Sequence, residues 1–372
     1  MNNLEMLLAQ FKDIATSPKK QFKLALEEGR KGVGCFPLYT PEPLIYAAGM
    51  LPFGMWGGDI EVFQAKKYLP AFACPVMQIN LENGLTGVYK GVSAVLIPTL
   101  CDTFRCITQD WKAGVCDIPM IAVAYPQQHN EAGVEFFVSE LKRIKAQLEK
   151  VSCTKITEQK ITEAIEVYNE YYHTMGEFVK LANEHLNIIT PSVRHEIIKS
   201  GWFVDKKVHM ALVRALNGEL QKLERYKGNE KRILLTGIMA EPMGIYQILE
   251  DNQMVVVADD LGQETRQFRY QIPTNKDALT NLSAHWAIRK DSTSHSSHKE
   301  RIQEMVTLAK EAKADGVIAC MMKFCDPEEY DFPSIKKEMN ASGIPVLYQE
   351  IDLQVSSLEQ ARTRIQTFGE MI

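Results

Sequence analysis

The chain has 372 residues, of which 45% are hydrophobic and 24% charged, and its formal net charge is −5 with a pI near 6.0. This length suffices for two domains with ample cores, and the acidic balance gives no reason to expect nucleic acid or a membrane surface as a partner. No stretch approaches 18 consecutive apolar residues, and the N-terminal segment lacks a signal-peptide pattern. Eight cysteines without such a signal predict a cytoplasmic protein whose thiols are free or metal-bound.

The first part of the chain alternates apolar runs with helical patterns. We expect strands near residues 32–35, 51–56, 94–97 and 120–124. Helices are predicted to open at Thr40-Pro41, after Cys74 and after Asp102, and an amphipathic helix follows with apolar residues from Val134 to Leu148. This order is typical of parallel strands with helices on both faces.

The middle of the chain has helical periodicity without a convincing strand as far as Lys227. Strands resume near residues 233–236, 254–258, 316–319 and 345–348, and a helix closes the chain. The predicted fold is therefore α/β, with two lobes that each contain a small parallel sheet flanked by helices. We expect an N-terminal lobe at 1–155, a helical connector at 156–228 and a C-terminal lobe at 229–372.

Three cysteines stand at predicted helix starts. Cys101 and Cys325 each follow a predicted strand and directly precede an aspartate and a helical pattern, and Cys74 opens another helix. Ligands collect at the carboxyl ends of parallel strands, and a helix N-terminus lowers the pKa of a thiol. Thiolates are the ligands that iron–sulfur clusters and zinc require. The pattern thus suggests one cofactor held between the two lobes.

The plainer interpretation is that these cysteines are small buried apolar residues, because their spacing matches no named cluster motif. From the pattern alone both interpretations stay open. We expect the remaining cysteines to pack or serve structure only: Cys35, Cys106, Cys116, Cys153 and Cys320.

Charged segments near the strand ends have ordinary explanations. The acidic turn at 326–329 is explained by helix capping, with Asp326 as the cap residue, and by the helix dipole. Arg266 and Arg269 could bind an anionic ligand or a partner's carboxylates, and we expect an interface role. His295 and His298 lie in a polar stretch that we interpret as a solvated loop rather than a metal site.

Several common motifs are absent from the sequence. The glycines at 32–34 lack the third glycine of the dinucleotide fingerprint, and no phosphate-binding loop of the ATPase type is present. The serine-hydrolase and zinc-protease motifs are also missing. The sequence therefore argues against these routes to NAD binding, ATP hydrolysis and hydrolytic catalysis.

Nearly the whole chain resembles the β subunits of the 2-hydroxyacyl-CoA dehydratases, which include 2-hydroxyisocaproyl-, phenyllactyl-, lactoyl- and 2-hydroxyglutaryl-CoA dehydratases of amino-acid fermentation. The most specific segment is Met-Met-Lys-Phe-Cys-Asp-Pro-Glu-Glu-Tyr at 321–330. Further matching segments lie at 34–37, 48–52, 56–58, 70–74, 101–103, 259–261, 263–269 and 360–364.

The resemblance implies a heterodimer with a related α subunit, each subunit holding a 4Fe-4S cluster on three cysteines between its lobes. Carried over to this sequence, the ligands are Cys74, Cys101 and Cys325, and a non-protein group completes the coordination. The acyl-CoA substrate is expected mainly on the α subunit. An ATP-dependent iron–sulfur activator protein would supply electrons, and a flavin in the complex stays open because no residue decides it.

The family's reaction removes water from an (R)-2-hydroxyacyl-CoA to give an (E)-2-enoyl-CoA. An added electron makes a ketyl radical anion of the thioester, which expels the hydroxyl and acidifies the β-hydrogen. Family α subunits have a serine loop and an acidic segment that face the substrate. The corresponding segments of this chain read Cys-Phe-Pro-Leu-Tyr-Thr at 35–40 and Met-Trp-Gly-Gly at 55–58. We therefore assign this subunit an electron relay and no catalytic acid or base.

Two alternatives remain at this stage. One is a subunit of an enzyme similar to aryl-CoA reductases, which would reduce its substrate instead of removing water. The other is a scaffold subunit without a redox role, whose cysteines pack or hold zinc.

Overall fold

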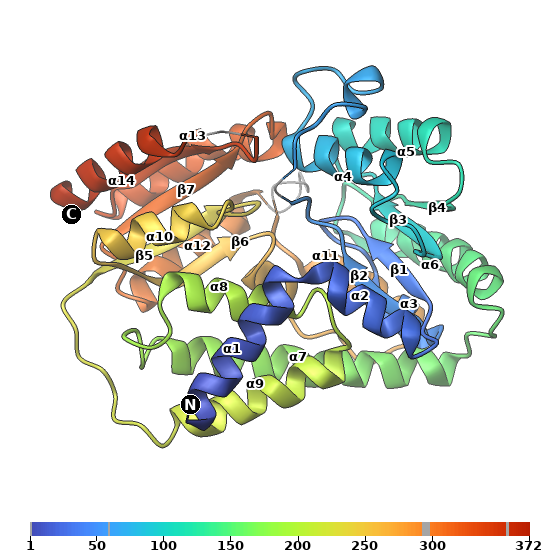
Figure 1. Ribbon diagram of the computed structural model, residues 1–372, viewed down its shortest axis with the longest axis horizontal. Coiled ribbons are helices and arrows are strands. Elements are labelled where there is room, and N and C mark those ends of the chain that lie inside the picture. Colours follow the sequence, from blue (N-terminus) through green and yellow to red (C-terminus); the bar gives the residue numbers. More distant parts are fainter. Residues whose placement is uncertain (1, 59, 292–297, 355–356) are drawn as a thin grey trace.

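A computed structural model describes residues 2–58, 60–291, 298–354 and 357–372. The described chain contains two four-stranded parallel sheets at opposite ends of the molecule (Figure 1). Their strand orders are β2-β1-β3-β4 and β6-β5-β7-β8, so the two lobes share one plan. Helices flank both sheets, which confirms the predicted α/β fold class.

The strands of the first lobe lie where the apolar runs predict them. They are β1 (Gly32–Cys35), β2 (Leu51–Gly54), β3 (Ala94–Pro98) and β4 (Met120–Val123). All residues of β1, β2 and β3 are buried, because helices cover both faces of the sheet. The accompanying helices are α3 (Glu42–Ala47), α4 (Pro75–Leu85), α5 (Asp102–Gly114) and α6 (Glu131–Ser152), with the short 3₁₀ turn η1 (Ala65–Lys67) before α4.

The second lobe repeats the plan with longer strands. They are β5 (Lys231–Gly237), β6 (Met254–Leu261), β7 (Gly316–Met322) and β8 (Val346–Ile351). Its helices are α10 (Gly244–Asp251), α11 (Ala278–Ile288), α12 (His298–Glu311), α13 (Asp326–Ala341) and α14 (Glu359–Met371), and the 3₁₀ turn η2 (Thr265–Gln267) follows β6. Helix α11, although it follows β6 in the chain, packs against α6 of the first lobe and against α7 (Glu158–Ala182).

A layer of helices runs below both sheets in Figure 1. It consists of α7 (Glu158–Ala182), α8 (Pro191–Ser200), α9 (Lys206–Leu220) and the N-terminal α1 (Asn3–Thr16), which packs on α8 and α9. Helix α2 (Pro18–Glu27) leads from α1 into the first sheet. Thr157, Thr190 and Asp205 cap α7, α8 and α9 by accepting backbone N–H bonds. None of the described helices is long and apolar enough to cross a membrane.

Candidate metal centre

The three cysteines expected to be ligands occupy the same kind of position. Cys74, Cys101 and Cys325 are the N-cap residues of α4, α5 and α13. Strand β3 ends at Pro98 and is followed by Cys101, while β7 ends at Met322 and is followed by Cys325. Since β3 and β7 hold the same place in the two sheets, these two thiols stand at equivalent positions of the two lobes.

One pocket brings all three thiols together. The pocket has a volume of about 570 Å³, which includes the solvent at its mouth, and residues of both lobes form its walls. Apart from the cysteines, the lining is largely apolar and consists of Pro37, Leu38, Val76, Met77, Asp102, Thr103, Phe104, Ile238, Phe324, Asp326 and Pro327. No fourth cysteine and no histidine is among these described lining residues.

The donor set fits an iron–sulfur cluster. Three soft thiols around an apolar pocket are what such clusters use, and the absent fourth thiol would leave one iron to a non-protein ligand. Within the described ranges, no three His, Cys, Asp or Glu side chains form a group that could hold one metal ion. Three cysteines lining one pocket could serve as ligands to a cluster.

The helix positions do not make these thiols acidic in the absence of metal, contrary to the prediction. Burial raises the pKa of Cys74 to about 12, although the N–H of Val76 lowers it. Burial likewise raises the pKa of Cys101, against the lowering effect of the Phe104 N–H, and it raises the pKa of Cys325 well above the usual value. Desolvation therefore outweighs the helix N-terminus, and a metal's positive charge would have to stabilise the thiolates.

The other five cysteines divide into two groups. Cys35 and Cys320 are buried within β1 and β7, which confirms that they pack. Cys106 and Cys153 are exposed, so the expectation that they pack is wrong for these two, and Cys116, which was expected to serve structure, is exposed as well. None of the five lines the cysteine pocket.

Arg266 in η2 is buried, and Arg269 just after it is partly buried; both pair with carboxylates of this chain, which contradicts the predicted interface role. The side chain of Arg266 is 2% exposed and donates to Glu328 and Asp291. Arg269 donates to Asp260 at 2.8 Å, and Arg301 of α12 joins the same network. The sequence did not reveal this network because its members come from segments far apart in the chain.

The acidic turn and the histidines also differ from their predicted roles. Cys325, not Asp326, is the cap of α13, and Glu328 is an ion-pair partner of two arginines rather than a solvated charge. His295 lies outside the described residues. The Nδ1 atom of His298 lies 2.6 Å from Asp331 Oδ1. This pairing differs from the prediction, which placed His298 in a solvated loop.

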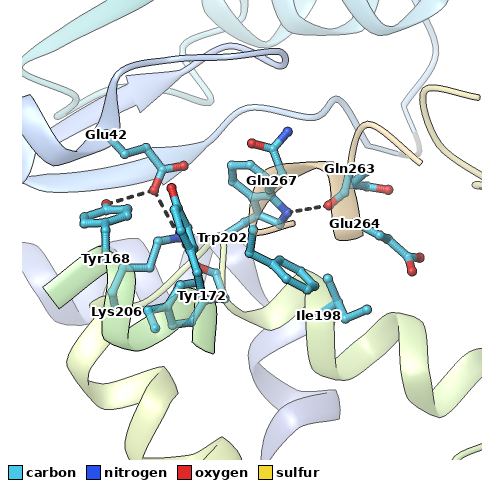
Figure 2. A pocket seen from close by; sticks show the side chains of 12 residues that line it. Glu42, Tyr168, Tyr172, Ile198, Trp202, Lys206, Gln263, Glu264 and Gln267 are labelled. Carbon is cyan, nitrogen blue, oxygen red and sulfur yellow. Dashed lines mark hydrogen bonds and ion pairs between the residues drawn. The ribbon is translucent and has the colours of Figure 1, made fainter. Parts of the chain in front are cut away.

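A second, separate pocket lies between α3, α7, α9 and the η2 segment (Figure 2). Glu42 accepts a hydrogen bond from the Tyr168 hydroxyl at 2.9 Å and pairs with Lys206 at 3.1 Å. Trp202 Nε1 donates to the Gln263 carbonyl at 3.1 Å, and neither amide atom of the Gln263 side chain has a partner among the described residues. Sequence patterns gave no signal for this pocket, and it contains none of the predicted ligands.

Comparisons with known proteins agree with the resemblance seen in the sequence. The (R)-phenyllactyl-CoA dehydratase beta subunit of Clostridium sporogenes is 43% identical, and the beta subunit of lactoyl-CoA dehydratase from Anaerotignum propionicum is 37% identical, each over 100% of both chains. The beta subunit of (R)-2-hydroxyglutaryl-CoA dehydratase from Acidaminococcus fermentans is 34% identical over 99% of this chain and 100% of its own.

A more distant relative, a benzoyl-CoA reductase subunit of Thauera aromatica, is 24% identical over 98% of this chain and 96% of its own. The family described as 2-hydroxyglutaryl-CoA dehydratase, D-component, matches residues 37–372, a range that contains all three cysteines of the pocket. The chain therefore belongs to the 2-hydroxyglutaryl-CoA dehydratase D-component family.

Proposed function

We propose that this chain is the β subunit of a 2-hydroxyacyl-CoA dehydratase and holds a 4Fe-4S cluster on Cys74, Cys101 and Cys325. The observation that carries the proposal is that the three thiols, each a helix cap, line one pocket between two lobes. When bound, such a cluster supplies one-electron chemistry at potentials as low as about −700 mV. We infer that the subunit relays an electron toward the substrate.

The chain's own residues would provide the setting for that cluster. Backbone N–H groups at the starts of α4 and α5 lower the pKa of the Cys74 and Cys101 thiols against the effect of burial, and hydrogen bonds to cluster sulfurs tune the potentials of iron–sulfur centres. The apolar lining, which includes Leu38, Met77 and Phe104, would limit the access of water. Both features support a redox site over a packing role for the thiols.

The reaction is the removal of water from an (R)-2-hydroxyacyl-CoA to form an (E)-2-enoyl-CoA, with the α subunit as partner. We place the acyl group mainly on that partner, because the three similar β subunits are named for aromatic, small and acidic acyl groups and yet align over their full lengths. An ATP-dependent iron–sulfur activator would deliver the electron. The eight free thiols agree with a cytoplasmic location.

Two measurements test this proposal in sequence. Anaerobic purification of the chain with its α subunit should give a brown complex with about four irons in this subunit. The complex, supplied with activator and ATP, should then convert at least one of the lactoyl, phenyllactyl, 2-hydroxyisocaproyl and 2-hydroxyglutaryl thioesters to its enoyl-CoA. Zinc or no metal in this subunit would contradict the redox role and favour a scaffold.

The distant reductase relative keeps a second function in view. It is named as part of a benzoyl-CoA reductase, and it aligns with nearly the whole chain at lower identity. Ring reduction of an aryl-CoA without enoyl-CoA formation would favour this alternative. The higher identity to three dehydratase subunits favours water elimination.

A further inference from the structure

A single buried arginine links the segments that the two lobes contribute to the walls of the cysteine pocket. One wall is the start of α13, where Cys325, Asp326 and Pro327 line the pocket and Glu328 follows directly. The other wall belongs to the first lobe, where Pro37 and Leu38 line the pocket and Tyr39 follows. On each side, the residue that follows the lining segment, Glu328 or Tyr39, has a polar side chain that forms a buried hydrogen bond.

Arg266 is that anchor on both sides. Its Nη1 atom donates to Glu328 Oε1 at 2.9 Å and to Asp291 Oδ2 at 2.8 Å. The same Asp291 oxygen accepts a hydrogen bond from the Tyr39 hydroxyl. One guanidinium nitrogen therefore links the C-terminal wall, through Glu328, to the N-terminal wall, through Asp291 and Tyr39.

The surroundings fix this arginine in place. Arg266 Nη2 ion-pairs with Asp260 at 3.0 Å, at the end of β6, and Arg301 holds the second oxygen of Glu328 at 2.8 Å. The side chains of Arg266 and Glu328 are 2% and 1% exposed. A planar, permanently charged group with several carboxylate partners in a dry site has few alternative positions.

We infer that Arg266 is a positioning residue for the cofactor of this subunit. It sets the place of Cys325 relative to the first-lobe wall and thereby the fit of the pocket to the cluster. The inference rests on the proposed function, because it concerns the same three thiols. It adds a residue that does not line the cysteine pocket and acts through Glu328 and Asp291.

The test compares two buried arginines in the complex with the α subunit. Arg266→Gln removes the link between the walls, while Arg194→Gln is the matched control, since Arg194 is 3% exposed and pairs with Asp259 and Glu264 instead. We expect Arg266→Gln to release iron to a chelator about 10-fold faster than wild type and to alter the EPR spectrum of the reduced cluster. Arg194→Gln should leave both properties unchanged, even if it lowers the unfolding temperature.

A milder variant covers the case in which Arg266→Gln does not fold. Tyr39→Phe removes only the hydroxyl that bonds to Asp291, and it should speed iron release and alter the EPR spectrum in the same direction by less. The inference about Arg266 would be overturned if every Arg266 and Tyr39 variant that folds released iron and gave an EPR spectrum as wild type does. It would also be overturned if Arg194→Gln changed both properties equally. Neither result would affect the proposed function. A wild-type chain without iron would instead overturn the proposed function and this inference with it.

Discussion

The two lobes have the same strand order and place a cysteine at the same point, yet they build their sides of the pocket differently. In each lobe the third strand leads to a helix capped by a cysteine, Cys101 in one and Cys325 in the other. The first lobe adds a second thiol, Cys74, at the start of α4. The second lobe instead surrounds the start of α13 with buried ion pairs.

This difference extends to how each helix is held. Helix α4 is buried along most of its length and is held by apolar packing together with hydrogen bonds from Gln78 and Asn80 to backbone carbonyls, without an ion pair among the described residues. The start of α13 depends on Glu328, whose two oxygens are held by Arg266 and Arg301. Charged pairs in a dry environment fix direction as well as distance. The same strand plan can therefore carry one wall that is rich in thiols and one that is fixed by charge.

The largest effect should come from removing the one thiol that the second lobe contributes. Cys325→Ala is expected to lose most of its iron, because only two protein ligands would remain in the pocket. Cys320→Ala is the control, since Cys320 is buried in the preceding strand and does not line the pocket. Iron and sulfide analysis after anaerobic purification measures both, and equal iron in the two variants would refute the ligand assignment.

A second prediction concerns the charged wall. Arg301→Met should destabilise the protein by about 3–5 kcal/mol, because Asp260, Glu328 and Asp331 would lose a buried partner. Urea unfolding followed by circular dichroism measures the change in the free energy of unfolding. A loss below about 1 kcal/mol would mean that the ion pairs do not fix this wall.

The strands and the three pocket cysteines could be predicted from the sequence, whereas the charged wall could not. Buried parallel strands are continuous apolar runs, so local patterns reveal them, and Cys101 and Cys325 come soon after two of these strands. The choice of Cys74, Cys101 and Cys325 as one set came from the resemblance, because the pattern alone left a packing role open. Arg266 looked like a surface residue because its partners, Asp291 and Glu328, are distant in sequence. Only the folded chain shows which charges meet.

The pKa of the thiols illustrates a second limit of sequence reasoning. A helix N-terminus is visible in the sequence near Cys74, but the depth of burial is not. Burial turned out to be the larger effect and raised the pKa instead of lowering it. The exposure of Cys106 and Cys153 was missed for the same reason.

A third prediction tests how the helical layer attaches to the second lobe. His195 of α8 lies between two carboxylates, with Nδ1 2.9 Å from Glu264 and Nε2 3.0 Å from Glu241. Burial would lower the pKa of His195, but the hydrogen bonds to Glu241 and Glu264 raise it above the usual 6.5. Lys199 also pairs with Glu241, and Tyr246 stacks on the imidazole at 4.3 Å.

The raised pKa fixes the direction of the pH dependence. Stabilisation by protonated His195 is fully present below about pH 6.5 and is lost as the pH rises through the higher pKa of the folded state. His195→Gln should therefore cost about 1–3 kcal/mol near pH 6 and less as the pH rises toward 9. Urea unfolding across this range measures the difference, and a cost that grows with pH would contradict the assignment.

The smallest effect is expected for an arginine of the first lobe. Arg105 pairs with Asp102 at 3.3 Å, but their side chains are 60% and 90% exposed. Arg105→Met should change the free energy of unfolding by less than about 1 kcal/mol, because water screens the pair. A loss comparable to that of Arg301→Met would erase the contrast between the exposed pair of the first lobe and the buried charges of the second.

The most direct test compares two triple cysteine substitutions in the complex with the α subunit. Replacing Cys74, Cys101 and Cys325 together by alanine should abolish the Mössbauer signal of a 4Fe-4S cluster in this subunit. Replacing the exposed Cys106, Cys116 and Cys153 together should leave that signal and about four irons in place. A cluster that survives the first triple substitution would contradict the account.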